Sequence, residues 1–236
     1  MLVDDAVALV PSIPGRRALL GLVGPPAAGK STLARRLVTG VNERLGPGTA
    51  AYLPMDGFHL SNAQLDRLGR RDRKGAPDTF DVDGYVALLR RVRATRERPV
   101  YAPDFDRRLD EPIAAGLVVP PHAGLVVTEG NYLADDGPGW DQVRDLLDEL
   151  WYVDAPRRLR ERRLLRRHVR GGRSESEARA FITASERPNA RRIERSRAHC
   201  TRVVVPGRPD PEDSPDDGRD DGPADGPDDG PDGPAL

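Results

Sequence analysis

The sequence is poor in cysteine and in aromatic residues, and it lacks a long apolar run. Its single cysteine, Cys200, excludes a disulfide within the chain and suits a reducing compartment. Aromatic residues make up 5% of the 236 residues, so aliphatic side chains must fill the core. No segment has the length and hydrophobicity of a membrane span, and the acidic start of the chain does not resemble a signal peptide. We therefore expect a cytoplasmic protein without a membrane partner.

The net charge of −1 conceals two regions of opposite sign. Residues 207–236 contain eleven acidic residues and two arginines, a charge of −9, among repeats of Asp, Gly and Pro. This composition predicts a disordered acidic tail. Residues 1–206 carry the remaining +8 and are long enough for one domain with a sizeable core. A basic body suits an anionic ligand such as ATP but does not by itself indicate nucleic acid.

Lysine is also scarce, since the chain has 2 lysines against 35 arginines, yet one lysine completes a phosphate-binding pattern. Residues 24–32 have two glycines five positions apart, followed by Lys and Ser, which is the P-loop pattern. A chain of this composition would contain it by chance about once in a thousand sequences. The residues predicted to bind nucleotide phosphates are Gly24, Pro25, Pro26, Ala27, Ala28, Gly29, Lys30, Ser31 and Thr32.

The chemistry of a P-loop requires these residue types. Glycine lets the backbone turn tightly and approach a phosphate closely, and the following helix directs its N-terminus at the same anion. Lys30 is expected to neutralise the outer phosphates as a catalytic cation, and the Ser31 hydroxyl to bind Mg²⁺. The apolar run at residues 18–23 predicts a buried strand before the loop, and Leu33, Leu37 and Val41 predict a helix after it.

The rest of the chain predicts alternating strands and helices with one long insertion. Further strands are expected at residues 50–55, 123–129, 150–154 and 201–205. Helices are expected at residues 82–94, 140–147, 156–170 and 174–197, the last interrupted at residues 187–189 by a proline. Residues 57–122 form the insertion, with a short helix at residues 62–68 and hairpin arms at residues 99–106 and 113–120. We expect this insertion to shape an acceptor pocket.

Two acidic residues lie at the carboxyl ends of predicted strands. Asp56 could face the γ-phosphate from the side opposite the P-loop and accept the proton of an attacking hydroxyl. Alternatively, Asp56 caps the next helix, a role for which Ser61 competes. Glu129 ends its strand where a Walker B acid would lie beside the metal, or else its carboxylate only accepts hydrogen bonds from strand-end backbone.

Residues 157–202 contain 16 arginines against 5 glutamates. Most of these arginines are expected on solvated helix faces, but a few suit a lid that closes over a migrating phosphoryl group. We assign Arg163 and Arg167 to catalysis and Arg173 to nucleotide binding. RNA binding is disfavoured because no aromatic residues interleave with the basic ones.

With these pieces assembled, the chain resembles P-loop small-molecule kinases of the uridine kinase and bacterial type I pantothenate kinase superfamily. More narrowly, it resembles the nucleoside/nucleotide kinase family proteins and their fructose-transport-system kinase-like branch. The resemblance covers residues 15–206, and its motifs lie at residues 24–32, 55–60, 75–81, 101–107, 129–132 and 166–173.

The resemblance implies an α/β fold with a doubly wound parallel sheet of the P-loop NTPase type, an acceptor-pocket insertion at residues 57–122 and an Arg-rich lid at residues 156–173. It implies ATP and Mg²⁺ as cofactors, Asp56 as catalytic base and Glu129 near the metal. The residues that it places against the acceptor are Asp56, Phe58, His59, Tyr101, Arg107 and Asn131. Residues 56–59 are nearer the pantothenate kinase form, but Tyr101-Ala102-Pro103 departs from the Tyr-Ser-His of those enzymes.

We therefore predict a kinase that transfers the γ-phosphoryl group of ATP directly to a hydroxyl of a small metabolite. The acceptor stays open among nucleosides, pantothenate-like molecules and sugars. The alternative is a regulatory P-loop ATPase that binds nucleotide and has no small-molecule acceptor. We expect no nucleic-acid partner and leave a homodimer open.

Overall fold

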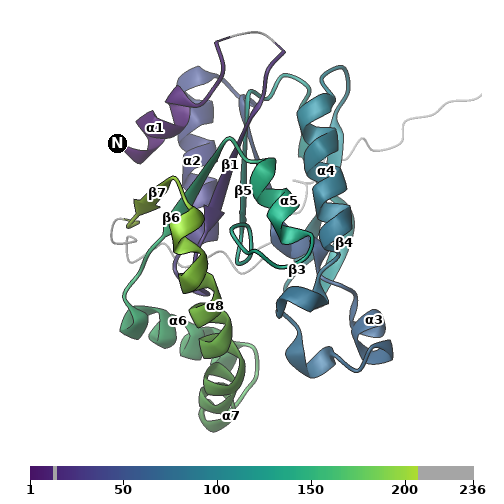
Figure 1. Cartoon of the computed structure of the whole chain (residues 1–236), viewed down its shortest axis with the longest axis vertical. Helices are drawn as coiled ribbons and strands as arrows, with labels where there is room; N and C mark the ends of the chain where they lie inside the picture. The colour runs from purple at the N-terminus through teal and green to yellow at the C-terminus, as the bar shows by residue number, and fades with distance from the viewer. Residues whose placement is uncertain (13–14, 207–236) are drawn as a thin grey trace, which may run out of the picture.

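A five-stranded parallel sheet forms the centre of the molecule, in the order β2-β5-β1-β6-β7 (Figure 1). The computed structural model describes residues 1–12 and 15–206, so the predicted acidic tail at residues 207–236 lies outside the described residues. The predicted sheet strands are confirmed, with shifts of one or two residues at their ends. They are β1 (Ala18–Val23), β2 (Ala50–Pro54), β5 (Leu125–Gly130), β6 (Glu149–Val153) and β7 (Arg202–Val204).

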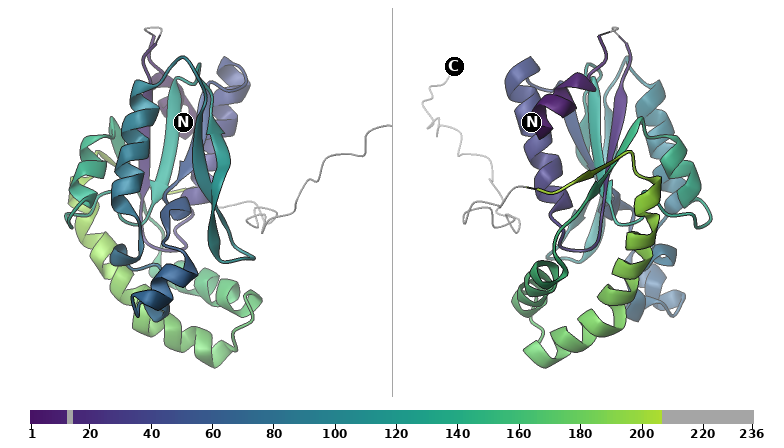
Figure 2. Two further views of the ribbon diagram at one scale, coloured as in Figure 1. Left: turned by 90° about the vertical axis from the view of Figure 1, so that its right-hand side faces the viewer. Right: turned by 60° about the vertical axis from the view of Figure 1, so that its left-hand side comes forward.

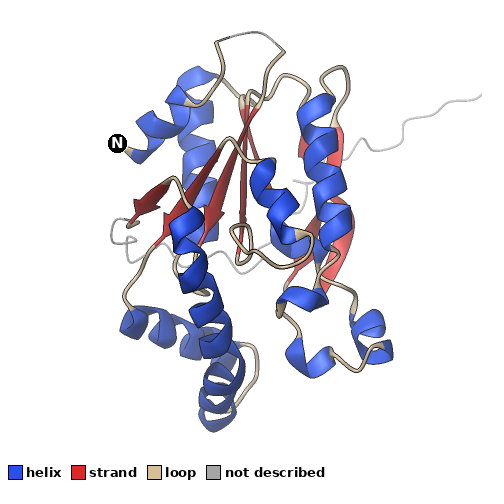
Figure 3. Ribbon diagram, viewed as in Figure 1, coloured by secondary structure: helices blue, strands red, loops and turns tan. Residues whose placement is uncertain are grey.

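Helices cover both faces of this sheet, as the sequence predicts (Figure 3). Side chains alternate along β1, so Leu19 joins one apolar cluster and Leu20 the other. The cluster around Leu20 is closed by α1 (Leu2–Ala8) and α2 (Lys30–Leu45). The cluster around Leu19 is closed by α4 (Val82–Ala94) and α5 (Trp140–Asp145). Burial on both faces explains why the central strands are continuous apolar runs.

The insertion between β2 and β5 begins with short helical turns and ends in a hairpin. Its first part contains η1 (Met55–Phe58), α3 (Asn62–Arg67), η2 (Arg71–Arg73) and η3 (Pro77–Thr79). After α4, strands β3 (Val100–Asp106) and β4 (Glu111–Val119) pair antiparallel. This hairpin lies beside the sheet and packs against β2 (Figure 2, left). The predicted hairpin is thus confirmed.

The Arg-rich segment forms a helical hairpin that extends beyond the end of the sheet at which the parallel strands terminate (Figure 2, right). Its elements are α6 (Arg157–Arg170), α7 (Glu175–Phe181), a π-helical turn η4 (Ile182–Glu186), α8 (Arg187–Arg195) and η5 (Ser196–His199). The predicted interruption at residues 187–189 is wrong, because Pro188 lies in the first turn of α8. The irregularity is η4, just before it. Proline cannot donate the usual helical hydrogen bond, and a wider turn upstream accommodates that loss.

Every helix in the described part of the chain is too short or too polar to cross a bilayer.

Candidate active site

The loop at residues 24–29 joins the end of β1 to the start of α2, and its two glycines are required for different reasons. A Cβ on Gly24 would lie 2.4 Å from the Val153 carbonyl oxygen of the neighbouring strand. Gly29 has a φ of +99°, in the left-handed region that glycine adopts without strain. The loop therefore lies tight against the sheet and turns its backbone into α2. The unpaired N–H groups of the first turn of this 16-residue helix then face the loop, as anion binding requires.

Lys30 is buried and points back into this loop. Its Nζ donates to the Gly24 carbonyl and to Asn131 Oδ1, each at 2.8 Å, and to the Pro25 carbonyl at 3.3 Å. Burial lowers the pKa of Lys30, while the nearby negative charges of Glu129 and Asp56 act in the opposite direction. Phosphate oxygens can replace these carbonyl partners. Asn131, predicted to face the acceptor, lies against the phosphate-binding lysine.

Ser31 and Glu129 meet at the predicted metal position. The Ser31 hydroxyl donates to Glu129 Oε1 at 2.7 Å, and the Tyr52 hydroxyl donates to the same oxygen at 2.8 Å. Burial raises the pKa of Glu129, and the charge of Asp56 raises it further. Burial and the Glu129 charge also raise the pKa of Tyr52. A hydroxyl and a carboxylate are the oxygen ligands that Mg²⁺ prefers.

The described residues contain no group of three or more His, Cys, Asp or Glu that could hold a metal ion alone. Protein sites commonly bind Mg²⁺ through one or two carboxylates together with substrate phosphates. Tyr52 was not predicted as a site residue. It belongs to β2, and only the pairing of β2 with β5, with Pro54 opposite Glu129, brings it near the acid.

Asp56 lies in η1, directly after the carboxyl end of β2. The alternative that it caps the next helix is wrong, because Ser61 caps α3 by accepting a hydrogen bond from the Gln64 N–H. The Asp56 carboxylate is 34% exposed, and Arg107 approaches its Oδ2 to 3.9 Å from the hairpin. A Cβ on Gly57 would lie 2.4 Å from the Pro103 carbonyl oxygen, so β3 packs directly on this turn.

His59 follows Asp56 in the same turn and is enclosed by two phenylalanines. Its ring lies 4.1 Å from that of Phe80 and 4.8 Å from that of Phe105, measured between centroids. Burial lowers the pKa of His59, so the imidazole is neutral at pH 7. Its Nδ1 is 2.7 Å from the Asp56 carbonyl oxygen. A carbonyl only accepts, so Nδ1 carries the proton and Nε2 keeps a lone pair.

Two other residues predicted to contact the acceptor have different surroundings. Phe58 is buried and packs against Tyr85 with ring centroids 5.0 Å apart, so it belongs to the core. Tyr101 is 57% exposed on β3, between the buried Val100 and Ala102, and faces away from the core. Its contact with an acceptor stays a prediction.

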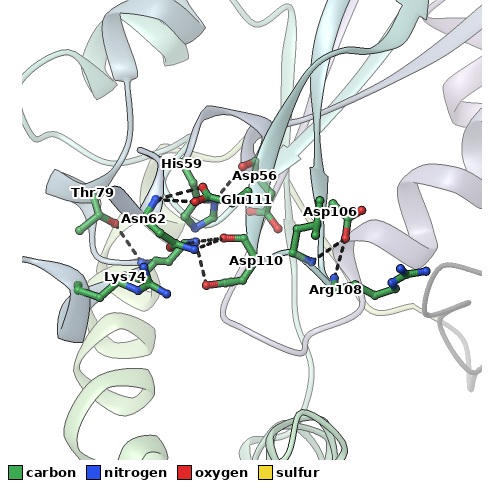
Figure 4. Close-up of polar contacts among 12 residues, drawn as sticks. Asp56, His59, Asn62, Lys74, Thr79, Asp106, Arg108, Asp110 and Glu111 are labelled. Atoms are coloured by element: carbon green, nitrogen blue, oxygen red, sulfur yellow. Dashed lines mark hydrogen bonds and ion pairs between the residues drawn. The ribbon is translucent and has the colours of Figure 1, made fainter. Parts of the chain in front are cut away.

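A group of polar side chains joins the turn of the β3–β4 hairpin to the start of α3 (Figure 4). Lys74 donates to Asn62 Oδ1 at 2.7 Å and to Asp110 Oδ2 at 2.9 Å, and lies 5.1 Å from the centre of the Phe105 ring. The Glu111 carboxylate accepts from the Asn62 N–H at 3.0 Å. Because Phe105 also contacts His59, this group forms one wall beside Asp56. The sequence offered one signal for it, Lys74 in the basic loop at residues 70–75.

The three predicted lid arginines make different contacts. Arg163 on α6 donates to the Ala27 carbonyl of the P-loop at 3.2 Å. Arg167, one helical turn later, lies 3.3 Å from the Glu186 carboxylate. Arg173 lies 4.0 Å from the centre of the Phe181 ring and donates to His168 at 2.8 Å. Among the described contacts of these three side chains, only that of Arg163 reaches the P-loop.

The parallel sheet, the phosphate-binding loop after its first strand and the acids at the ends of β2 and β5 define a P-loop NTPase fold. The chain matches no protein-family model. It is 35% identical over 161 residues to the provisionally named uridine kinase C227.14 of Schizosaccharomyces pombe, covering 66% of this chain and 68% of that protein. It is 33% identical over 141 residues to a pantothenate kinase of Limosilactobacillus reuteri, covering 58% of this chain and 45% of that protein.

A solved structure agrees with these sequence relatives. A protein of Silicibacter sp. TM1040, provisionally named a fructose transport system kinase, superposes with a TM-score of 0.78 and 33% identity. The match covers 86% of this chain and 97% of that chain. The chain therefore belongs to the P-loop kinase superfamily of uridine kinase-like and pantothenate kinase-like proteins.

Proposed function

We propose that this chain is a kinase that transfers the γ-phosphoryl group of ATP to a hydroxyl of a small metabolite. The observation that carries the proposal is Asp56, whose carboxylate stays partly exposed while Lys30 and Glu129 beside it are buried. A regulatory ATPase needs no acid on the side opposite the P-loop, whereas a kinase needs one to receive the proton of its acceptor.

The P-loop, residues 24–32, would bind the phosphates of ATP, with Lys30 against the outer ones. Ser31 and Glu129 would hold Mg²⁺, which neutralises phosphate charge when it is bound. We further infer a kinase domain of residues 1–206, in which the insertion at residues 57–122 shapes the acceptor pocket. The predicted lid at residues 156–173 consists of α6 and the turn after it. Helices α7 and α8 form the second arm of the same helical hairpin.

In this mechanism transfer is direct: Asp56 accepts the proton of the acceptor hydroxyl as that oxygen bonds to the γ-phosphorus, the bond from this phosphorus to the β-phosphate oxygen breaks, and ADP leaves. Arg107 lies close enough to orient the Asp56 carboxylate. The neutral His59 can accept a hydrogen bond from the acceptor at Nε2. Arg163 and Arg167 would stabilise the charge that spreads over the oxygens of the migrating group, and Arg173 is proposed to contact the nucleotide.

The names of the relatives suggest which acceptors to test: nucleosides, pantothenate and sugars such as fructose. A coupled assay of ADP release with MgATP and each candidate separates the two functions. A rate that depends on one acceptor class supports the kinase. A slow rate that no acceptor changes supports the regulatory ATPase and contradicts our proposal.

A further inference from the structure

The π-helical turn η4 ends at Glu186, whose side chain is 11% exposed and lies against α6. One of its oxygens, Oε1, is 3.3 Å from Arg167 NH2 and 3.2 Å from His168 Nε2. A single carboxylate on the second arm of the helical hairpin thus holds two consecutive side chains of the first arm. Single π turns inside helices redirect side chains and are frequent at functional sites.

The contacts of His168 determine where its proton lies. Arg173 NH1 is 2.8 Å from His168 Nδ1, and a guanidinium can only donate hydrogen bonds. Nδ1 must therefore be unprotonated, which leaves the proton on Nε2, facing Glu186. The result is a continuous chain in which Arg173 donates to His168, and His168 and Arg167 both donate to Glu186. Two of the three predicted lid arginines are linked through this chain.

Glu186 is ionised in this environment. Burial by itself would raise the pKa of Glu186, but the hydrogen bond from His168 and the charge of Arg167 outweigh it, so the pKa lies below its usual value. A carboxylate with these partners is satisfied, whereas one left alone in the same place would be costly to bury.

Two observations place this part of the helical hairpin near the P-loop. Glu186 lines the same cleft as Pro26 of the loop. Arg163, one turn before Arg167 on α6, donates to Ala27 of the loop at 3.2 Å. The charges of Arg167 and Glu186 also shift the pKa of Lys30, although less than burial and the charges of the two site acids do. A guanidinium has five N–H donors, so the contact with Glu186 leaves others for phosphate oxygens.

We propose that Glu186 is a positioning residue that holds the Arg167 guanidinium toward the migrating phosphoryl group, while the His168–Arg173 pair holds the same carboxylate oxygen in place. The inference rests on the proposed kinase function, because it assigns Arg167 a task in transfer. Glu186 itself acts only through Arg167.

The test is a double-mutant cycle of Glu186→Gln and Arg167→Ala, followed by acceptor-dependent ADP release. The change from glutamate to glutamine keeps the shape of the side chain and removes its charge. We expect Glu186→Gln to lower kcat about tenfold or more with the KM for ATP nearly unchanged, because Arg167 acts mainly in the transition state. In the Arg167→Ala background, Glu186→Gln should lower kcat no further. The matched control is Glu175→Gln, an exposed carboxylate paired with Arg179 in the same hairpin, which should leave kcat unchanged.

A second measurement separates failure of this inference from failure of the proposed function. The ¹⁵N NMR shifts of His168 in the wild-type protein should report a proton on Nε2, and Glu186→Gln should shift that signal. A protein that phosphorylates no acceptor but gives these shifts would overturn the kinase proposal while keeping the contact chain. The role of Glu186 would be overturned if Glu186→Gln lowered kcat equally in the wild-type and Arg167→Ala backgrounds. A proton on Nδ1 of His168 would overturn it as well.

Discussion

The Ser31 hydroxyl donates to Glu129 Oε1 at 2.7 Å, joining the first turn of α2 to the end of β5 across 98 positions of sequence. Parallel pairing of β1 with β5 brings these two oxygens together, with Val23 opposite Gly130. Because Tyr52 donates to the same carboxylate oxygen from β2, three neighbouring elements meet at the candidate metal position.

Asp56→Asn is expected to lower kcat about 10²- to 10⁴-fold, because the amide cannot receive the proton of the acceptor hydroxyl. ATP affinity should change little, since the P-loop is untouched. Turnover is measured by ADP release and affinity by calorimetric titration of MgATP. Asp66→Asn on α3, where the carboxylate is 62% exposed and 3.8 Å from Arg71, is the control and should retain full turnover. Retained turnover in Asp56→Asn would remove this residue from the mechanism.

Tyr52→Phe is expected to raise the Mg²⁺ concentration needed for half-maximal activity about 10- to 100-fold. The loss of a partner that orients a metal ligand commonly weakens metal binding by such a factor. The substitution should also change the pH dependence. The hydrogen bond from the Tyr52 hydroxyl favours the ionised form of Glu129 and lowers its pKa, against a rise caused by burial. Without this donor the pKa of Glu129 rises, so the proton competes with the metal at higher pH.

The acidic limb of the pH–rate profile should therefore move to higher pH in Tyr52→Phe, and added Mg²⁺ should move it back. Mg²⁺ titrations of the rate at several pH values measure both effects. An unchanged Mg²⁺ requirement in this variant would show that Glu129 does not depend on Tyr52.

Lys74→Met is expected to raise the KM for the acceptor about tenfold or more and to leave the KM for ATP unchanged. Lys74 is 12% exposed and ties the hairpin turn at Asp110 to Asn62, so its loss frees the wall that supports Phe105 and His59. Steady-state kinetics in both substrates measure the split. Arg71→Met, in the same basic loop but 45% exposed, is the control. Equal effects on both KM values would argue that Lys74 only stabilises the fold.

Gly24→Ala is expected to destabilise the protein by about 1–3 kcal/mol, because the new methyl group would meet the Val153 carbonyl oxygen of the adjacent strand. Gly171→Ala, at the end of α6, is the matched control. Its φ is −76° and its added Cβ would make only ordinary contacts at 3.5 Å, so stability should change little. Urea unfolding of both variants measures the difference. Wild-type stability in Gly24→Ala would mean that the loop is less tightly packed than described.

The sequence predicted the parts of this structure that depend on local pattern. The P-loop, the apolar runs of β1 and β5 and the amphipathic face of α4 are each visible in a short window, because burial on one or both sides dictates their residue types. Asp56 and Glu129 were predicted because each follows such a run. The cap of α3 was open between Asp56 and Ser61, and the hydrogen bond from the Gln64 N–H to the Ser61 hydroxyl decided it.

Other parts depend on pairing between distant segments. Tyr52 reaches Glu129 only through the register of β2 on β5, and Glu186 meets Arg167 through the packing of the two arms of the helical hairpin. Tyr101 was expected at the acceptor, but strand alternation turns it to solvent while Val100 and Ala102 face inward. A short window of sequence does not reveal how distant segments pair, so the sequence alone could not place these residues.

The most direct test of the proposed reaction follows the phosphorus itself. The full-length protein is incubated with Mg²⁺, ATP labelled at the γ-phosphate and the acceptor selected by the ADP-release screen, and the labelled products are separated. We expect the label on a hydroxyl of the acceptor in amounts equal to the ADP formed, and we expect this transfer to be lost in Asp56→Asn. Label recovered only as inorganic phosphate, at the same rate with and without acceptor, would contradict the account.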